Sequence, residues 1–340
     1  MICFCWVQLP QYAARCIGAF ARMSSEEVVV FATKPRVPIE GMERCIPGGV
    51  VWIDEAESRT LLEICQKKPR AFFVSGWATP LFNRYRDEVH KDGGKVFALS
   101  DNNFIFSIEE CIKSIRFRCF VRSKYDGYFV PGLSGEKLLR FYGVKKKLIA
   151  KGVYAADGSL FHDGKPLKQR PKRIIFVGRL TEVKNVLRLC AAFRMSQGAA
   201  NGWTLDIYGC GESRSLLKDG DGISIHDFLQ PEGLAEEYRQ SRVFILPSIK
   251  EHWGLVVHEA ALSGCVLLLS NCIGAKDDML GKRNGFTFNP WKVNDIASAM
   301  HKAYSMSDDD LLIAHDESLE MAKNASIDKF VEGMNRLLSI

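Results

Sequence analysis

The sequence predicts an α/β protein of two domains, each built on a doubly wound, Rossmann-like parallel sheet. The chain has 340 residues, more than a typical single domain, and 47% of them are hydrophobic, which suffices for a substantial core. Short runs of β-branched and aromatic residues alternate with helical stretches in both halves. Ligands of such domains bind at the carboxyl ends of the strands.

In the first half, a short strand is expected before Gln8, and further strands are expected at 28–31, 50–53, 71–74, 96–99 and 128–130. Residues 109–122 combine apolar and basic side chains and are expected to be helical. Gly164, Pro166 and Pro171 lie in a polar stretch that we interpret as the linker.

In the second half, the expected strands are 174–177, 205–208, 243–246 and 266–269. An amphipathic helix is expected to begin after Ser326, its N-cap, and to carry Phe330, Met334 and Leu337 on its apolar face. We therefore expect an N-terminal domain over 1–168, a second domain over 169–320, and a helix over 321–340 that packs back toward the first domain.

The composition narrows the class of protein and its compartment. Arg15 and Arg22 interrupt the apolar opening segment, so neither a membrane-spanning helix nor a signal peptide is expected there. The eleven cysteines include no CxxC pair and no matching histidine spacing for zinc. An odd number of scattered cysteines favours reduced thiols in a cytoplasmic protein.

Charge is unevenly distributed. Residues 1–151 contain 24 Lys and Arg against 16 Asp and Glu, an excess of +8, whereas residues 152–340 contain 22 against 24. Such an excess favours an anionic partner. Without an RNA-binding signature, nucleic acid is not expected.

The most basic segment of this half carries Arg116, Arg118, Arg122 and Lys124 beside Ile115, Phe117 and Phe120. These cations are expected to meet anionic lipid headgroups or a lipid diphosphate, which would place the protein peripherally on the inner face of a membrane. The alternative is a solvated basic face.

The segment from Glu251 to Glu259 follows an expected strand and enters an expected helix over 255–263. Free backbone N–H groups at a helix start suit a diphosphate, and Gly254 allows close approach to the backbone. Glu259 would then accept hydrogen bonds from ribose hydroxyls, and Glu251 would reach the sugar beyond the phosphates. The alternative is a solvated acidic loop followed by a glutamate on the helix surface.

Two cations follow the first strand of the same half, Arg179 and Lys184. A departing nucleoside diphosphate needs its growing negative charge neutralised, and two fixed cations achieve this without a metal ion. The alternative is a pair of surface cations.

With these residues in place, the second half resembles the retaining GT-B glycosyltransferases of glycosyltransferase family 4 over roughly residues 172–300. The family pattern of strand, Gly-Arg-Leu and Lys is matched from Val177 to Lys184, and its glycine-bearing turn at Tyr208 to Gly211. The remaining matches are Pro247, Ser248, Glu251, Gly254, Leu255, Glu259, Ala260, Gly264 and Asn284 to Phe286.

The resemblance implies a GT-B fold, with two Rossmann-like domains facing a central cleft. It implies transfer of a sugar, with retention, from a UDP- or GDP-sugar to a hydroxyl of a glycan or lipid-linked glycan in cell-surface polysaccharide biosynthesis, with no cofactor and no metal site. Arg179 and Lys184 would bind the diphosphate with the backbone of Gly254, Leu255 and Val256. Glu259 would bind the ribose, and Glu251, His252 and Trp253 the donor sugar. His252 and Trp253 replace a commoner small residue and Phe.

Other assignments rest on position alone. Asp227, Phe228 and Leu229 occupy the place of the base pocket but depart from the usual Phe-x-Gly, and Gln8, Leu9 and Pro10 occupy the place of an acceptor-side loop. Asp101 ends a strand where many members carry a residue near the reacting carbon, so we assign it with Glu251 as catalytic. The alternative for Asp101 is an Asx turn or a helix N-cap.

Two motifs are interpreted as structural. Asp219-Gly220-Asp221 resembles a metal-binding Asp-x-Asp but is expected to form a surface turn, and the glycines at 209 and 211 form only an imperfect dinucleotide fingerprint. The functional alternatives to a glycosyltransferase are a nucleotide-sugar epimerase or phosphorylase of the same fold, and a catalytically silent glycan-binding relative.

Overall fold

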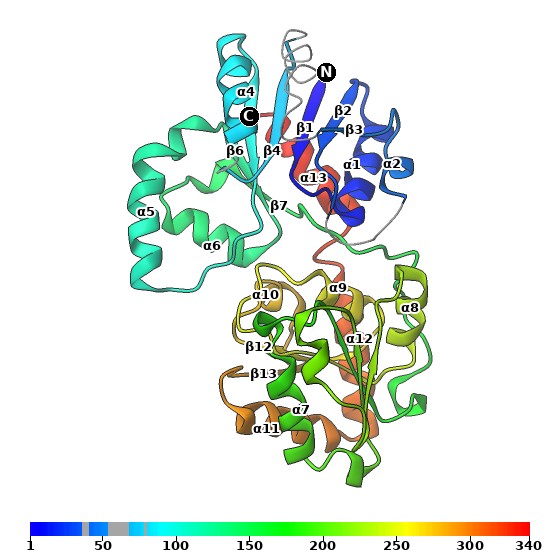
Figure 1. The fold of residues 1–340 in the computed structure, drawn as a ribbon. Helices are drawn as coiled ribbons and strands as arrows, with labels where there is room; N and C mark the ends of the chain where they lie inside the picture. Colours follow the sequence, from blue (N-terminus) through cyan, green and yellow to red (C-terminus); the bar gives the residue numbers. More distant parts are fainter. Residues whose placement is uncertain (36–40, 54–67, 78–79) are drawn as a thin grey trace. The chain divides into compact units, whose positions relative to one another are not determined.

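The computed structural model describes residues 1–35, 41–53, 68–77 and 80–340. The chain forms two compact units (Figure 1). One unit combines Met1–Ala155 with Ala325–Ile340, and the other is Ala156–Asn324. The chain thus passes between the units at 155/156 and 324/325, whereas the sequence-based boundaries are 168/169 and 320/321.

The first unit contains a seven-stranded parallel sheet in the order β3-β2-β1-β4-β5-β6-β7. Strand order reverses between β1 and β4, and this reversal marks the switch point at which such sheets bind ligands. The strands are β1 (Ile2–Trp6), β2 (Val28–Ala32), β3 (Val51–Trp52), β4 (Ala71–Ser75), β5 (Lys95–Leu99), β6 (Gly127–Val130) and β7 (Ile149–Lys151). The helices are α1 (Gln11–Met23), α2 (Met42–Cys45), α4 (Pro80–Lys91), α5 (Ile108–Phe120), α6 (Leu133–Phe141) and α13 (Ile327–Leu338).

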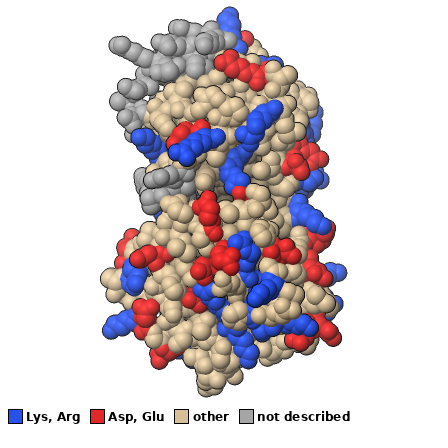
Figure 2. Space-filling model, turned by 90° about the vertical axis from the view of Figure 1, so that its right-hand side faces the viewer, with Lys and Arg blue, Asp and Glu red and all other residues tan. Residues whose placement is uncertain are grey.

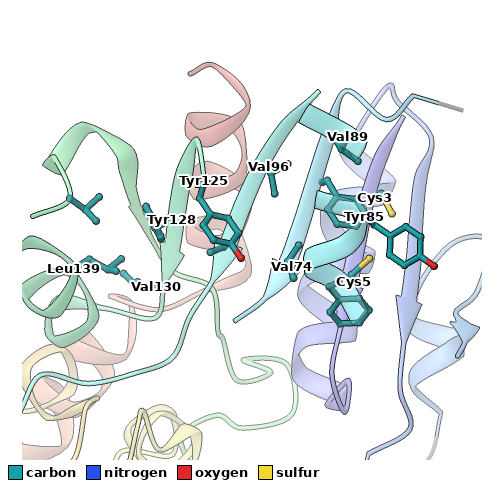
Figure 3. Close-up of a cluster of buried hydrophobic side chains, with 14 of the residues drawn as sticks. Cys3, Cys5, Val74, Tyr85, Val89, Val96, Tyr125, Tyr128, Val130 and Leu139 are labelled. Atoms are coloured by element: carbon teal, nitrogen blue, oxygen red, sulfur yellow. The ribbon is translucent and has the colours of Figure 1, made fainter. Parts of the chain in front are cut away.

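Both faces of this sheet are buried. Successive side chains of each strand point to opposite sides, and other elements pack against the side chains on each side. On one face, Cys3 and Cys5 of β1 join a cluster with Tyr85 of α4 and Leu139 of α6 (Figure 3). On the other face, the ring of Phe4 lies 6.4 Å from that of Phe20 in α1. The continuous apolar strands of the sequence are thus those of a sheet covered on both sides.

Helix α13 belongs to the first unit although it ends the chain. As predicted, Ser326 caps it by accepting a hydrogen bond from the Lys329 N–H. Its apolar face is buried, and the Phe330 ring lies 5.3 Å from that of Phe129 in β6.

The second unit contains a six-stranded parallel sheet in the order β10-β9-β8-β11-β12-β13, with its switch point between β8 and β11. Helices α7 and α11 contact each other, as do α9 and α12. The strands are β8 (Arg173–Val177), β9 (Thr204–Tyr208), β10 (Ile223–His226), β11 (Val243–Leu246), β12 (Val266–Ser270) and β13 (Gly285–Phe288). The helices are α7 (Val186–Met195), α8 (Pro231–Arg239), α9 (Leu255–Leu262), α10 (Lys276–Met279), α11 (Val293–Tyr304) and α12 (Asp308–Ala322).

The stretch interpreted as a linker packs within the second unit. Arg170 is only 2% exposed, and its guanidinium donates to the carbonyls of Lys165 and Ser241 at 2.6 and 3.0 Å. The glycine and prolines of this stretch therefore shape a packed segment rather than a connection between the two units.

The surface carries both signs of charge interspersed with neutral residues on the face drawn in Figure 2. Among the described residues, no helix is both long enough and apolar enough to span a bilayer.

Candidate active site

The predicted diphosphate-, ribose- and sugar-binding residues of the second unit lie after the carboxyl ends of β8 and β11. These strands are neighbours in the sheet and flank its switch point. The loop after β8 carries Arg179 and leads to a short 3₁₀ helix, η4 (Glu182–Lys184), and the loop after β11 carries Glu251 and leads to α9. Because the strands are parallel, both loops leave the same edge of the sheet.

Lys184 and Glu251 form an ion pair between these two loops. Their side chains are 15% and 16% exposed, and the hydroxyl of Ser248 donates to the same carboxylate oxygen at 3.2 Å. The sequence placed both residues near the phosphates and the sugar but did not predict their contact. The interpretation of Lys184 as a surface cation is wrong, because its ammonium group is held in a mostly buried pair.

Arg179 is the second cation of this edge. Its side chain is exposed and forms neither an ion pair nor a hydrogen bond with any residue in the described part of the chain. Its guanidinium is therefore available to an anion.

The loops after β8 and β9 approach each other closely. A Cβ atom at Gly209 would lie 1.9 Å from the carbonyl oxygen of Gly178, and the Leu180 N–H donates to the Cys210 carbonyl at 2.8 Å. Gly209 therefore allows backbone packing between these loops, which agrees with the structural interpretation of the imperfect dinucleotide motif.

Helix α9 begins directly after Gly254, which has a left-handed backbone with φ 88° and ψ 70°. No side chain caps this helix start, so the N–H groups of its first turn lack a side-chain acceptor. Unpaired N–H groups and the helix dipole together attract an anion to this point. The diphosphate site at Gly254, Leu255 and Val256 stays a prediction, with which this helix start is compatible.

Glu259 lies about one turn further along α9 and is held by Tyr238 of α8, whose hydroxyl donates to its carboxylate at 3.2 Å. Burial raises the pKa of Glu259 to about 7, and the hydrogen bond from Tyr238 opposes this shift. Burial thus favours the neutral form of Glu259 more than in an exposed glutamate. The expectation of a glutamate on the helix surface does not fit this environment.

His252 and Trp253 contribute two nitrogen atoms without protein partners. The Nδ1 atom of His252 and the Nε1 atom of Trp253 are buried and form no hydrogen bond within the described chain. Buried polar atoms without partners are uncommon and call for an explanation such as a bound ligand or water. Both residues lie between Glu251 and the start of α9.

Sequence reasoning missed Asn185 and Tyr238. Asn185 follows Lys184, and its amide donates to the carbonyls of Pro247 and Pro290 at 3.1 and 2.8 Å. It thereby ties the loops after β11 and β13 to the start of α7. No motif marks either residue, since each acts by holding a neighbour.

The proposed base loop, Asp227, Phe228 and Leu229, leaves the end of β10. Asp227 is exposed, and the other two residues are half-buried. Before it, the His226 ring stacks on Tyr208 at 4.4 Å and contacts Asp206 at 2.7 Å. Burial favours a higher pKa for Asp206, but hydrogen bonds from Arg173 and His226 lower it below its usual value.

In the first unit, Gln8, Leu9 and Pro10 lie at the switch point. The Gln8 N–H donates to the Thr33 hydroxyl at 2.7 Å, and Gln8 has the left-handed φ of 53° that is uncommon outside glycine. Leu9 is fully buried, so its side chain is a core residue.

Asp101 follows β5 and is partly buried. The N-cap of α5 is Ser107, so Asp101 does not cap this helix. Burial raises the pKa of Tyr154 well above its usual value, and the charges of Asp101 and the nearby Tyr12 and a hydrogen bond that Asp101 accepts from the Tyr154 hydroxyl add to this shift. Asp101 and Glu251 belong to different units.

The Asp-x-Asp motif is engaged in local structure. Asp219 accepts a hydrogen bond from the Ile225 N–H at 2.8 Å, and Asp221 pairs with Arg194 at 3.1 Å. Within the described ranges, no group of three or more His, Cys, Asp or Glu side chains is placed to hold a metal ion.

The fold and the candidate site define a class: a two-unit α/β protein with an ion pair and an uncapped helix start at the switch point of its second sheet. Residues 171–306 match the family described as "Glycosyl transferases group 1". An uncharacterized glycosyltransferase of Haemophilus influenzae is 26% identical over 190 residues, which is 54% of each protein. The alignment thus spans about half of that relative.

Solved structures agree with the fold over the full chain. A glycosyltransferase of Rickettsia africae superposes with a TM-score of 0.76 at 12% identity, covering 99% of this chain and 98% of that one. Anabaena HepE in complex with UDP superposes with a TM-score of 0.77 at 13% identity, covering 100% of both chains. The predicted GT-B, two-domain α/β fold is confirmed.

Proposed function

We propose that this protein transfers a sugar from a nucleoside-diphosphate sugar to a hydroxyl group of a glycan acceptor. The observation that carries the proposal is the Lys184–Glu251 pair, which lies at the switch point between β8 and β11 beside the uncapped start of α9. A diphosphate bound there meets a cation, N–H groups and the helix dipole together. The family of residues 171–306 and the UDP bound to Anabaena HepE support a nucleotide-sugar donor.

Each residue has a role in this proposal. Lys184 and Arg179 neutralise the charge that develops on the leaving diphosphate. Glu251 leaves its ion pair partly or wholly to accept hydrogen bonds from the donor sugar. Glu259 binds the ribose, and the unpartnered nitrogens of His252 and Trp253 form hydrogen bonds with the donor substrate. Asp101 acts at the acceptor side of the reacting carbon.

We further propose that the reaction proceeds with retention and without a metal, as the family 4 resemblance implies. The bond from the anomeric carbon to the phosphate oxygen breaks, and the diphosphate leaves with the electron pair. The acceptor oxygen bonds to the same face, and its proton passes to the leaving phosphate. The acceptor is a glycan or lipid-linked glycan of a cell-surface polysaccharide.

A thermal-shift screen of UDP-, GDP- and ADP-sugars tests the donor site. Nucleotide sugars with one of the bases are expected to raise the unfolding temperature of the protein. A ligand at about 100 times its Kd adds about 2.7 kcal/mol to the free energy of unfolding. Turnover of the nucleotide sugar without any acceptor would instead indicate an epimerase. If no nucleotide sugar shifts the transition, the chain is a silent relative and the proposal is wrong.

A further inference from the structure

Helix α5 exposes apolar side chains on the side that faces away from the core. Its inward side is anchored by Phe117, which is 3% exposed and lies 4.9 Å from the Tyr142 ring, and by Ser114, whose hydroxyl donates to the Phe141 carbonyl at 3.2 Å. The opposite side carries Ile108, Ile112, Ile115 and Cys119, all exposed. We call these four residues the α5 stripe.

The spacing of the α5 stripe is that of one helix face, since its members follow each other by four, three and four positions. Ile108 is 83% exposed and Ile115 65% exposed. Phe106, just before the helix, and Phe120, at its end, extend this apolar surface. Their exposed fractions are 71% and 67%. An ordinary surface helix presents polar residues to water, so a continuous exposed apolar face indicates a binding surface.

Basic residues border the stripe. Arg116 and Lys124 are exposed and form no hydrogen bond or ion pair with the described residues. Arg118 and Arg122 donate to the carbonyls of Phe141 and Gly143 at 2.6 and 3.3 Å, so their side chains hold the end of α6. Lys113 pairs with Glu109 at 2.8 Å.

We infer that the α5 stripe inserts into the surface of a lipid bilayer with anionic headgroups. An exposed apolar face bordered by cations fits the boundary between acyl chains and anionic headgroups, where apolar residues lie below the phosphates and basic residues lie among them. The excess of +8 in residues 1–151 complements the same surface. This inference does not depend on the donor site of the second unit.

Sequence reasoning expected an attachment based on charge. The structure reduces the expected share of charge in this attachment, because two of the four cations hydrogen-bond to backbone carbonyls of the same unit. Phe117 is a core residue and does not contribute to the exposed surface. The main contact is therefore the insertion of apolar side chains, and the cations select the lipid. Such binding weakens in salt but does not vanish, since the screening length falls from about 10 Å at 0.1 M to about 3 Å at 1 M while apolar burial is unaffected.

The test is sedimentation of the full chain with vesicles of phosphatidylcholine alone or mixed with phosphatidylglycerol, at about 0.1 and about 1 M salt. The stripe variant is Ile112→Ser with Ile115→Ser. The matched control is Leu312→Ser on α12, because Ile112 and Leu312 are both 56% exposed. Circular dichroism and the unfolding temperature establish that each variant folds.

Wild type and Leu312→Ser are expected to bind the anionic vesicles equally and to keep part of that binding at high salt. The stripe variant is expected to lose at least tenfold in vesicle affinity at both salt levels, with unchanged thermal shift by nucleotide sugar. An Arg116→Ala, Lys124→Ala variant is expected to lose several-fold, at low salt only.

Three outcomes overturn the inference. The first is equal vesicle binding by wild type and the stripe variant, and the second is no vesicle binding by wild type. The third is a wild type that self-associates in solution without lipid and becomes monomeric on the stripe substitutions, which would make this face an interface between copies of the chain.

Discussion

The buried ring of His258 accepts a hydrogen bond on Nδ1 from the backbone N–H of Ala156 at 3.0 Å. Its Nε2 atom lies 3.0 Å from the carbonyl oxygen of Ala322, so the neutral ring that carries its proton on Nε2 satisfies both contacts. Ala156 begins the second unit and Ala322 lies near its end. One side chain of α9, next to the proposed ribose-binding Glu259, therefore ties down both ends of that unit.

Replacing Lys184 with Ala is expected to reduce sugar transfer more than about a hundredfold, because the developing charge of the diphosphate loses its main cation. The structure adds a stability cost of about 1 to 3 kcal/mol, since Glu251 is left mostly buried without its partner. Initial rates and urea unfolding measure the two effects. Lys218→Ala, at an exposed lysine of the same unit, is the control. Wild-type rates in Lys184→Ala would overturn the assignment.

A double-mutant cycle of Lys184→Ala and Glu251→Ala tests the ion pair itself. Residues in direct contact couple by about 0.5 to 3 kcal/mol, so the double variant should be more stable than the sum of the single losses predicts. Additive losses in urea unfolding would mean that the pair does not form in solution.

Chelation by EDTA is expected to leave transfer nearly unchanged, because Arg179, Lys184 and the start of α9 meet the charge of the diphosphate. Asp219→Ala is expected to lower stability, through its lost hydrogen bond to Ile225, without changing the response to metal. Loss of activity in EDTA that manganese restores would instead indicate a metal site.

Replacing Glu259 with Gln is expected to change the pH dependence of stability. Burial raises the pKa of Glu259 from 4.5 to about 7, so the unfolded chain releases this proton first and wild-type stability falls as pH rises through that window. The free energy of unfolding of Glu259→Gln relative to that of wild type should therefore increase by about 3 kcal/mol between pH 4.5 and 7.5. Urea unfolding at both pH values measures it, and a constant difference would contradict the prediction.

His258 produces the opposite slope. Burial lowers its pKa from 6.5 to about 4, so the unfolded chain binds this proton first and stability falls as pH drops through that window. The free energy of unfolding of wild type relative to that of His258→Gln should decrease by about 3 kcal/mol as the pH falls from 7 to 4. Between pH 4.5 and 6.5 the effects of Glu259 and His258 on the free energy of unfolding nearly cancel in wild type. A variant that lacks one of the two groups therefore shows the pH dependence caused by the other. Unfolding curves of the double variant, which should show neither slope, provide the control.

The sheet could be predicted from sequence wherever a strand has neighbours on both sides. All of the interior strands of the second sheet were predicted from their apolar runs, whereas β10 and β13, which were missed, are its two edges. In the first sheet, the missed β7 is also an edge strand. Edge strands have one neighbour and less apolar surface to bury, so short or mixed segments such as Gly285–Phe288 suffice and give little signal.

The sequence marks candidate site residues where a glycine or a charged side chain stands in a recognisable motif, as at Gly254 and Lys184. Contacts made by residues distant in sequence could not be predicted, because they depend on which loops the sheet order brings together. Tyr238 meets Glu259, and Asn185 meets Pro247, only in the folded sheet. The same limit applies to α5, where sequence cannot distinguish an arginine facing lipid from one holding the end of α6.

The composition of the first unit from Met1–Ala155 and Ala325–Ile340 affects the order of events during synthesis. The ribosome makes the strands β1 to β7 of the first sheet before the second unit, but it makes α13 after that unit. Until then, the apolar face of β6 and β7 that α13 covers lacks its cover. The second unit is a continuous insertion and can fold as it emerges, so the first unit should finish folding after the second. Nascent chains stalled before residue 325 should therefore be more sensitive to protease in their first half than in their second.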